Sequence, residues 1–233
     1  MSYAGQIAAH SFRQSRPPVA IEDLESDSPI ELETVGTICN FSKGETIFGE
    51  GDAIDASYKV VSGVVRLCRL TSDGRRQIAG FRLPGDLIGI EWNGAYDMTA
   101  EAVRDVVVVR YSRARLDRLS HEKAVVRDHL LSHLCRDLRS AQEHLITLGC
   151  QSAVERVASF LLQLARRAGI GDGGVIDMQL GRQDIADYLG LTLETVSRTF
   201  TELTNRGLIA TPKRRHVQIN SKARLKAAAI PLH

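Results

Sequence analysis

The chain has 233 residues, of which 43% are hydrophobic, so it can bury more than one core and we expect at least two domains. No apolar run is long enough to cross a bilayer and the first 20 residues lack a signal-peptide core, which predicts a soluble, cytoplasmic protein without membrane contact. The net charge of +2 is unevenly spread: from Gln151 onward 12 Lys or Arg face 7 Asp or Glu, which favours a nucleic acid as partner for this third.

The first segment, residues 1–30, is polar and holds the pair Pro17-Pro18 and the acidic run Glu22–Glu25. Such a composition cannot bury much apolar area, so we expect a flexible N-terminal arm. The first folded domain is therefore expected to begin near residue 31.

Residues 31–118 are predicted to form a domain of short β-strands. Apolar or alternating runs are separated by turn signals such as Ser62-Gly63 and Asp73-Gly74, in which Gly accepts a positive φ. Many short strands with Gly-rich turns are typical of a small barrel or a jelly-roll-like β-roll. The expected strands are Thr46–Phe48, Ser57–Val61, Val64–Leu70, Gln77–Leu83 and Val103–Tyr111.

A long helix is predicted for residues 119–150. Its apolar side chains recur at alternating steps of three and four residues, which is the a/d pattern of a coiled coil, and Gly149 marks its end. This stripe is narrower than the one that a helix needs to pack on its own domain, although such packing stays open as an alternative. We therefore predict that two copies of the chain pair along this seam. The expected dimerisation residues are Leu131, Leu134, Leu138, Ala141, Leu145 and Leu148.

Residues 151–233 are predicted to form a DNA-binding domain. A helix is expected over Ala153–Ala168, and the segment Arg182–Arg206 then has the pattern of a helix-turn-helix. Gly190 supplies the turn conformation that a β-carbon disfavours, and Thr192 can cap the second helix. The spacing of Val196 directs it back onto the first helix, where the two helices close a small core.

Packing of the second helix on the first leaves one face outward, at the end that enters a major groove. Thr192, Leu193, Glu194, Ser197 and Arg198 are predicted to contact DNA there. An Arg can bond guanine O6 and N7 together, and a Glu can accept from cytosine N4. An exposed i,i+4 ion pair is the alternative for the Glu and the Arg, but it does not account for the framework around them.

The segment Thr211–Ile219 is predicted to be a β-hairpin wing with a basic tip. Its cations, Lys213, Arg214 and Arg215, are expected to meet phosphates and to position the protein without reading sequence. The predicted fold class is thus α+β: an N-terminal β-roll, a long dimerisation helix and a C-terminal winged helix-turn-helix.

This order of elements resembles the catabolite activator/FNR (Crp/FNR) superfamily over roughly Leu32 to Ile219. The resemblance implies the cyclic-nucleotide-binding-domain fold for the β-roll, and double-stranded DNA, a second copy of the chain and RNA polymerase as partners. It rests on Lys43–Glu45, Glu50–Asp52, Ser62-Gly63, Asp73–Gln77, Leu83–Asp86, Glu155–Leu161 and Glu194–Arg198.

Within the superfamily, Glu194-x-x-Ser197-Arg198 looks like the FNR branch. The resemblance implies that these three side chains read TTGAT-type half-sites arranged as an inverted repeat. A transcription regulator of this branch, most often an activator, is therefore expected.

Two sensors of the superfamily lack their residues in this sequence. Cyclic-nucleotide members hold the phosphate with a Gly-Glu…Arg-Ser/Thr-Ala cassette, whereas Gly89–Ala100 has no Arg and carries Asp97, which would repel a phosphate. FNR holds an iron–sulfur cluster with N-terminal cysteines, and here no cysteine precedes Cys39. The chain thus resembles the FixK group, which implies no cofactor and control of genes for low-oxygen respiration, denitrification or nitrogen fixation.

An enzyme is one alternative, because small β-rolls overlap with cupin-like metalloenzymes. Those enzymes need a histidine-rich metal set inside the barrel, and no histidine lies between Leu32 and Ser112. His129 and His133 lie four residues apart on the long helix, and they are interpreted as exposed surface residues because they fall off the seam. We therefore predict no catalytic residue and no metal site.

A ligand- or haem-gated sensor and a thiol switch are further alternatives. Cys68 could ligate haem from within the β-roll, although a core cysteine is the simpler interpretation. Cys135 flanks the seam and could cross-link two subunits. The four cysteines form no CxxC pair, so free thiols are expected.

Overall fold

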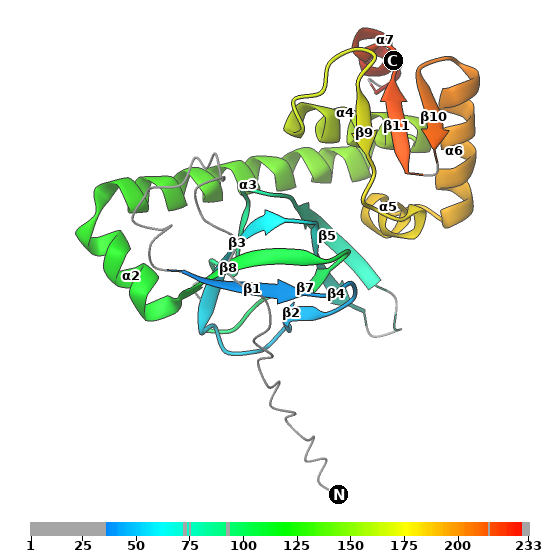
Figure 1. Ribbon diagram of the computed structural model, residues 1–233. Coiled ribbons are helices and arrows are strands. Elements are labelled where there is room, and N and C mark those ends of the chain that lie inside the picture. Colours follow the sequence, from blue (N-terminus) through cyan, green and yellow to red (C-terminus); the bar gives the residue numbers. More distant parts are fainter. Residues whose placement is uncertain (1–35, 72–73, 75, 92–93, 214, 230–233) are drawn as a thin grey trace, which may run out of the picture.

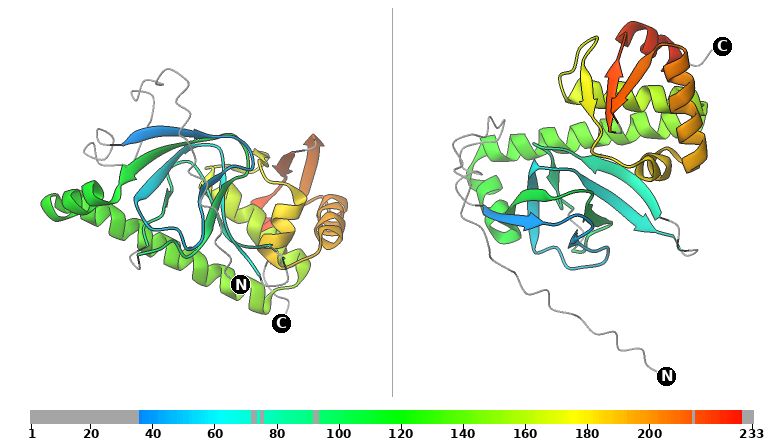
Figure 2. Two further views of the ribbon diagram at one scale, coloured as in Figure 1. Left: turned by 90° about the horizontal axis from the view of Figure 1, so that it is seen from below. Right: turned by 45° about the vertical axis from the view of Figure 1, so that its right-hand side comes forward.

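The computed structural model describes residues 36–71, 74, 76–91, 94–213 and 215–229. A β-roll is followed by two helices, α2 (Arg113–Glu122) and α3 (Ala124–Cys150), and then by a C-terminal domain (Figure 1). Helix α3 runs along one side of the β-roll and reaches the C-terminal domain, which lies beside one end of the roll (Figure 2). The arm predicted for residues 1–30 and the wing residue Arg214 lie outside the described residues.

The β-roll consists of two four-stranded antiparallel sheets, in the strand orders β1-β8-β3-β6 and β2-β7-β4-β5. Side chains of the central strand β8 alternate as a half-buried strand requires: Val106 and Val108 are buried, and Val107 and Val109 less so. The strands are β1 (Thr37–Phe41), β2 (Thr46–Phe48), β3 (Ala56–Ser62), β4 (Val65–Leu70), β5 (Arg76–Arg82), β6 (Leu87–Ile88), β7 (Thr99–Ala102) and β8 (Val106–Ser112).

Aromatic side chains fill the centre of the roll. The rings of Phe48 and Tyr96 stack with centroids 3.9 Å apart, and the rings of Phe48 and Tyr58 stack with centroids 5.8 Å apart. The Tyr96 hydroxyl donates to the Ala56 carbonyl at 2.6 Å, so this buried polar atom is satisfied. The predicted β-roll is confirmed, with an interior packed by these rings.

Turn chemistry was a reliable signal in this domain. Gly63, predicted in a hairpin turn, has φ +85°, and a β-carbon there would lie 2.4 Å from the Asp105 carbonyl oxygen. The five predicted strands all exist, but Val103–Tyr111 was too long, because the strand begins only at Val106. Strands β1, β6 and β7 were not predicted; β6 has two residues, and β7 reads TAEA, which lacks the bulky side chains typical of strands.

The predicted helix 119–150 is in fact two helices. Lys123 has extended backbone angles (φ −123°, ψ 106°) and separates α2 from α3, so the boundary at residue 119 falls inside α2. Ser112 caps α2 by accepting a hydrogen bond from the Arg115 N–H. No helix within the described residues is long and apolar enough to cross a membrane.

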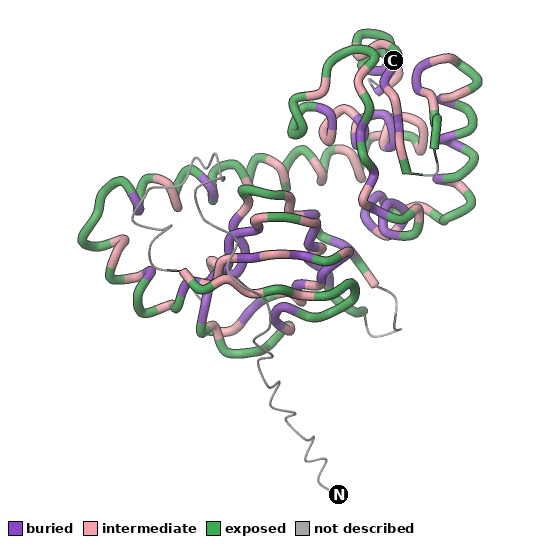
Figure 3. The backbone as a smooth tube through the Cα atoms, in the orientation of Figure 1, coloured by how far each residue is buried: buried purple, intermediate pink, exposed green. Residues whose placement is uncertain are grey.

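Helix α3 has two apolar or buried faces rather than one. One face packs on its own chain and includes the fully buried Val126 and the 6%-exposed His133. The prediction that His133 is an exposed surface residue is therefore wrong, because this face of the helix covers the β-roll near Lys59 and Asp86. The leucine seam lies on a neighbouring face and most of its residues are exposed. Much of the length of α3 is exposed to solvent (Figure 3).

The C-terminal domain is a helical core with a three-stranded sheet of order β10-β11-β9. Helix α4 begins with a capping box, in which Ser152 and Glu155 satisfy each other's backbone N–H groups. One core unites the domain, with Leu161, Ile185, Leu203 and Ile219 almost completely buried. The elements are α4 (Ala153–Arg167), β9 (Val175–Asp177), α5 (Arg182–Leu189), α6 (Leu193–Asn205), β10 (Ile209–Lys213), β11 (His216–Ile219) and α7 (Lys222–Ala229).

Candidate nucleic-acid interface

Helices α5 and α6 form the predicted helix-turn-helix. Gly190 ends α5 in the left-handed conformation (φ 61°, ψ 39°), and the Leu191 N–H still donates to the Ala186 carbonyl at 3.0 Å. The Thr192 hydroxyl then accepts a hydrogen bond from the Thr195 N–H at 3.1 Å and starts α6. A Gly and a Thr two residues apart thus set the angle between the two helices.

The inner face of α6 is apolar and buried. Val196 belongs to the same core as Ile185 and Leu189 of α5, as its spacing predicted, and Phe200 and Leu203 extend this core along α6. Thr199 is also buried, whereas Glu194, Ser197 and Arg198 lie on the opposite side of the helix and are exposed. Helix α6 therefore presents a defined set of side chains to solvent.

The outward face carries the predicted base-reading residues. Glu194 and Arg198 form an i,i+4 ion pair whose side chains remain 71% and 78% exposed, so the pair contributes little to stability. The Ser197 hydroxyl donates to the Leu193 carbonyl at 2.9 Å, which leaves its oxygen able to accept from a base. Leu193 is 46% exposed, a large apolar side chain in water that suits contact with a thymine methyl group.

The wing is the antiparallel hairpin β10–β11, which β9 extends on the other side. Lys213 and Arg215 are exposed at its turn, next to Arg214. A groove of about 480 Å³ separates the wing from α6, with Lys213 on one wall and Ser197 and Asn205 on the other. The structure thus brings one predicted base-reading side chain, Ser197, and one predicted phosphate-binding side chain, Lys213, to the two sides of one groove.

Arg182, the first residue of α5, is a candidate contact that sequence reasoning missed. Its guanidinium carbon lies 3.2 Å from the centroid of the Phe200 ring, and the side chain lines the groove with Lys213. Burial lowers the pKa of this guanidinium to about 10, so it remains charged at neutral pH. The sequence identifies Arg182 only as the start of a helix, since no local pattern pairs it with Phe200, 18 positions away.

We call the C-terminal domain, residues 153–229, the reading head, and Arg156 of α4 joins it to the long helix α3. Its guanidinium donates to the carbonyls of Leu148, Gln151 and Leu189 at 2.8 to 2.9 Å. These carbonyls belong to the C-terminal ends of α3 and α5, where helices leave acceptors without partners. One cation therefore ties together the end of the predicted dimerisation helix and the first helix of the helix-turn-helix.

The predicted seam residues divide into two groups. Leu131, Leu134, Leu138 and Leu145 are 46% to 68% exposed, and Ala141 between them is also exposed. Leu148 is half-buried beside Gly190, so it also contacts the reading head of its own chain.

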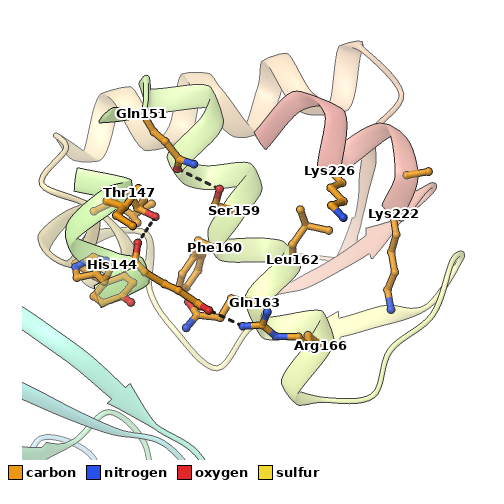
Figure 4. Close-up of a pocket in the computed structure, with 15 residues that line it drawn as sticks. His144, Thr147, Gln151, Ser159, Phe160, Leu162, Gln163, Arg166, Lys222 and Lys226 are labelled. Atoms are coloured by element: carbon orange, nitrogen blue, oxygen red, sulfur yellow. Dashed lines mark hydrogen bonds and ion pairs between the residues drawn. The ribbon is translucent and has the colours of Figure 1, made fainter. Parts of the chain in front are cut away.

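A hollow of about 630 Å³ lies between α3, α4 and α7, apart from the recognition helix (Figure 4). Several of its polar side chains already have partners: Ser159 donates to Gln151, and Arg166 pairs with Glu143. At its edge the rings of His144 and Tyr188 stack with centroids 4.0 Å apart. The hollow thus marks where the three helices meet.

The cysteines do not gather into a site. Within the described residues no three side chains of His, Cys, Asp or Glu are placed to hold a metal ion. Burial raises the pKa of the Cys68 thiol to about 11, which opposes the thiolate form that would ligate a haem iron. Cys135 and Cys150 are exposed on α3, and all four cysteines are free thiols.

A β-roll, a long helix and a winged helix-turn-helix with an outward-facing polar recognition surface define a class of DNA-binding transcription regulators. Residues 155–228 match the model of the Crp-like helix-turn-helix domain, and residues 38–123 match the cyclic nucleotide-binding domain. The chain belongs to the Crp/FNR family, in its FixK group, whose members are transcription regulators and not enzymes.

Several relatives show this membership. The chain is 41% identical to the nitrogen fixation regulation protein FixK of Bradyrhizobium diazoefficiens, over 84% of this chain and 83% of that protein. It is 40% identical to FixK of Azorhizobium caulinodans, over 97% of this chain and 92% of that protein. The solved structure of FixK2 from Bradyrhizobium japonicum has a TM-score of 0.80 at 37% identity, covering 85% of this chain and all of that one.

Proposed function

We propose that this protein is a homodimeric activator that reads two-fold symmetric DNA sites with TTGAT-type half-sites. The observation that carries the proposal is the outward face of α6, where Glu194, Ser197 and Arg198 lie exposed in the first turns. Each subunit offers one such face, and two faces are needed for an inverted repeat. Lys213, Arg215 and Arg182 would hold the flanking phosphates.

The leucine seam of α3 supports the homodimer. Four leucines that are 46% to 68% exposed form a continuous apolar stripe along one face of the helix. A monomeric protein rarely leaves such a stripe in water, and a second α3 would cover it with matching side chains. Ala141, in the middle of the stripe, permits close approach of the two helices.

The genes under control are proposed from the relatives. Two of them are named nitrogen fixation regulation proteins, and a further relative, from Cereibacter sphaeroides, is the transcriptional activator FnrL at 34% identity. We infer that this chain acts in the cytoplasm, with RNA polymerase as partner, on genes for nitrogen fixation, denitrification or low-oxygen respiration.

We further propose that DNA binding needs no cyclic nucleotide, although the β-roll belongs to that domain family. The segment Gly89–Ala100 offers no Arg for a phosphate, and the backbone carbonyl of its Asp97 is occupied by the Arg69 guanidinium at 2.6 Å. Its Tyr96 ring packs on Phe48 inside the roll, where it occupies apolar space. These residues do not fit a cyclic nucleotide.

The direct test is a titration of purified protein, without added effector, against a duplex holding the TTGAT inverted repeat. Tight binding is expected, and it should weaken sharply when either half-site is scrambled, because both subunits must be engaged. The salt concentration is held fixed, since phosphate contacts make affinity strongly salt-dependent. Equal affinity for the intact and scrambled duplexes would contradict the proposal.

Arg198→Ala and Lys213→Ala are expected to weaken binding in different ways. Arg198→Ala should cost about 1–3 kcal/mol and relax the base preference at one position, because it removes a base contact. Lys213→Ala should weaken all sequences alike and flatten the salt dependence, because it removes a phosphate contact. Titrations of both variants against a set of single-base site variants at several salt concentrations check this, and identical behaviour of the two would refute the assigned roles.

A further inference from the structure

The β-roll and α5, the first helix of the helix-turn-helix, are held together by charged side chains. Arg66 of β4 donates to Asp184 of α5 at 2.8 Å and also pairs with Glu101 of β7 at 2.7 Å. Arg76, at the start of β5, donates to Asp187 at 3.0 Å and reaches Asp184 at 3.5 Å. We call these two arginines and two aspartates the clamp.

The clamp is shielded from solvent. The side chains of Arg66, Asp184 and Asp187 are 14%, 12% and 14% exposed, and that of Arg76 is 28% exposed. Ion pairs at this depth are screened little by salt, and breaking one leaves an unpaired charge with a large desolvation cost. The clamp is therefore far more sensitive to a single substitution than the exposed Glu194–Arg198 pair.

An apolar contact lies beside the clamp. Phe81 of β5 faces the ring of Tyr188 on α5 with centroids 5.3 Å apart, and it faces Phe160 of α4 at 6.4 Å. Phe81 and Ile78 of the β-roll belong to the same buried core as the helix-turn-helix. Apolar packing combined with ion pairs is the arrangement of specific protein interfaces, here within one chain.

The clamp acts on the element that carries the recognition helix. Asp184 also caps α5, since its second carboxylate oxygen accepts from the Gly181 N–H at 3.1 Å. The chain connects the reading head to α3 through two residues, Gln151 and Ser152, and side chains add contacts between them: Arg156 with the Leu148 carbonyl, Arg166 with Glu143, and His144 with Tyr188. On the β-roll side, the clamp acts together with the ion pair between Arg167 of α4 and Asp86, and these contacts hold the reading head beside one end of the roll (Figure 2).

We propose that Arg66 and Arg76 are positioning residues for DNA binding, which hold α5, and with it the recognition helix, in the orientation that a two-fold site requires. The inference rests on the proposed reading of an inverted repeat, because two recognition helices must lie about 34 Å apart to reach both half-sites. A reading head that is released from the β-roll samples other orientations, and its apparent affinity falls with the fraction that remains competent.

The test is a charge-swap cycle in the full-length protein. Arg76→Asp places three carboxylates together, and Asp187→Arg places two cations together, so each single variant should release the head. Each is expected to weaken binding to the full inverted repeat about tenfold, whereas binding to a single half-site should change less than about threefold. The double variant restores both the pair and the net charge and should recover affinity to within about threefold.

A matched control separates the clamp from a general charge effect. Arg69 lies on the same strand as Arg66 but pairs at 2.8 Å with Glu50 of its own domain, and both side chains are exposed to solvent. Arg69→Asp makes the same charge change as Arg76→Asp and should leave the full site bound as in the unaltered protein. Circular dichroism melting checks that the reading head stays folded, and small-angle X-ray scattering should show a wider particle for the two single variants alone.

The following outcomes would contradict either the positioning role of the clamp or the proposed function. If Arg76→Asp binds like Arg69→Asp, or if full site and half-site weaken equally, the positioning role is wrong. Tighter binding by the single variants would mean that the clamp opposes DNA binding, and it would also overturn the inference. If the unaltered protein ignores the inverted repeat, the proposed function fails, but the scattering comparison, which needs no DNA, still tests the clamp.

Discussion

Leu134→Glu is expected to convert the protein into monomers and to weaken binding to a two-fold site by roughly 100-fold or more. Leu134 is 46% exposed and is the second of the six seam residues. In the proposed dimer the two copies of the new carboxylate would meet across the two-fold axis, in an apolar interface where an unpaired charge is costly. A monomer keeps one reading head, so it loses the gain that comes from engaging two half-sites together.

Sedimentation equilibrium and titration with the inverted repeat measure this effect. Ser132→Glu is the matched control, because Ser132 is exposed on the same helix but lies about 100° around it from Leu131. The control should remain dimeric and bind normally, and Leu138→Glu, at a seam residue that is 61% exposed, should behave like Leu134→Glu. Intact dimers of both seam variants would place the interface elsewhere on the chain.

His133 is expected to make the protein less stable in acid, by about 3 kcal/mol at full protonation. This side chain is 6% exposed, between α3 and the β-roll. Burial, with smaller contributions from Arg136, His129 and Lys59, lowers its pKa from 6.5 to about 4, and Asp86 opposes this shift. Because the unfolded chain then binds the proton more readily than the folded chain, the free energy of unfolding falls as the pH is lowered from about 6.5 to about 4. From about pH 7.5 upward the residue is almost fully neutral in both states and no longer contributes to the pH dependence.

Urea unfolding at a series of pH values tests this expectation. His133→Gln removes the titrating ring, so its unfolding free energy should depend less on pH in that window than that of the unaltered protein. His121→Gln, at an exposed histidine of α2, is the control and should leave the pH dependence unchanged. If both variants kept the full pH dependence, other groups would be responsible for acid sensitivity.

Local signals made the helix-turn-helix predictable. Gly190 and Thr192 are needed for their backbone conformation and their capping bond, and both requirements involve residues within a few positions of each other. The same holds for the turn at Gly63 and for the strongly alternating strand β8. These features were therefore visible without knowledge of the fold.

The inner face of α3 was missed for the opposite reason. Its half-buried or buried residues include His133, Asp137, Ser140, His144 and Thr147, which do not register as an apolar stripe. Only the adjacent leucines showed a hydrophobic period, so the helix was assigned one functional face. Polar residues became buried here because the β-roll and the reading head supply their surroundings.

The clamp could not be predicted from local sequence patterns either. Arg66 and Asp184 are 118 positions apart, and each alone resembles any surface charge of a strand or a helix. Arg182 and Phe200 pose the same problem at shorter range. Contacts between elements depend on how the chain is arranged in space, which no local spacing encodes.

The double role of Asp184 limits how this protein can evolve. One oxygen of its carboxylate accepts from the Gly181 N–H at the start of α5, and the other accepts from Arg66. A mutation at this position is therefore expected to change both the stability of α5 and the proposed domain orientation. Asn could keep the first role but would weaken the second, because it carries no charge. Natural variation in the orientation of the reading head is therefore expected at Arg76 and Asp187. Substitutions there can change the ion pair without removing the capping bond between Gly181 and Asp184.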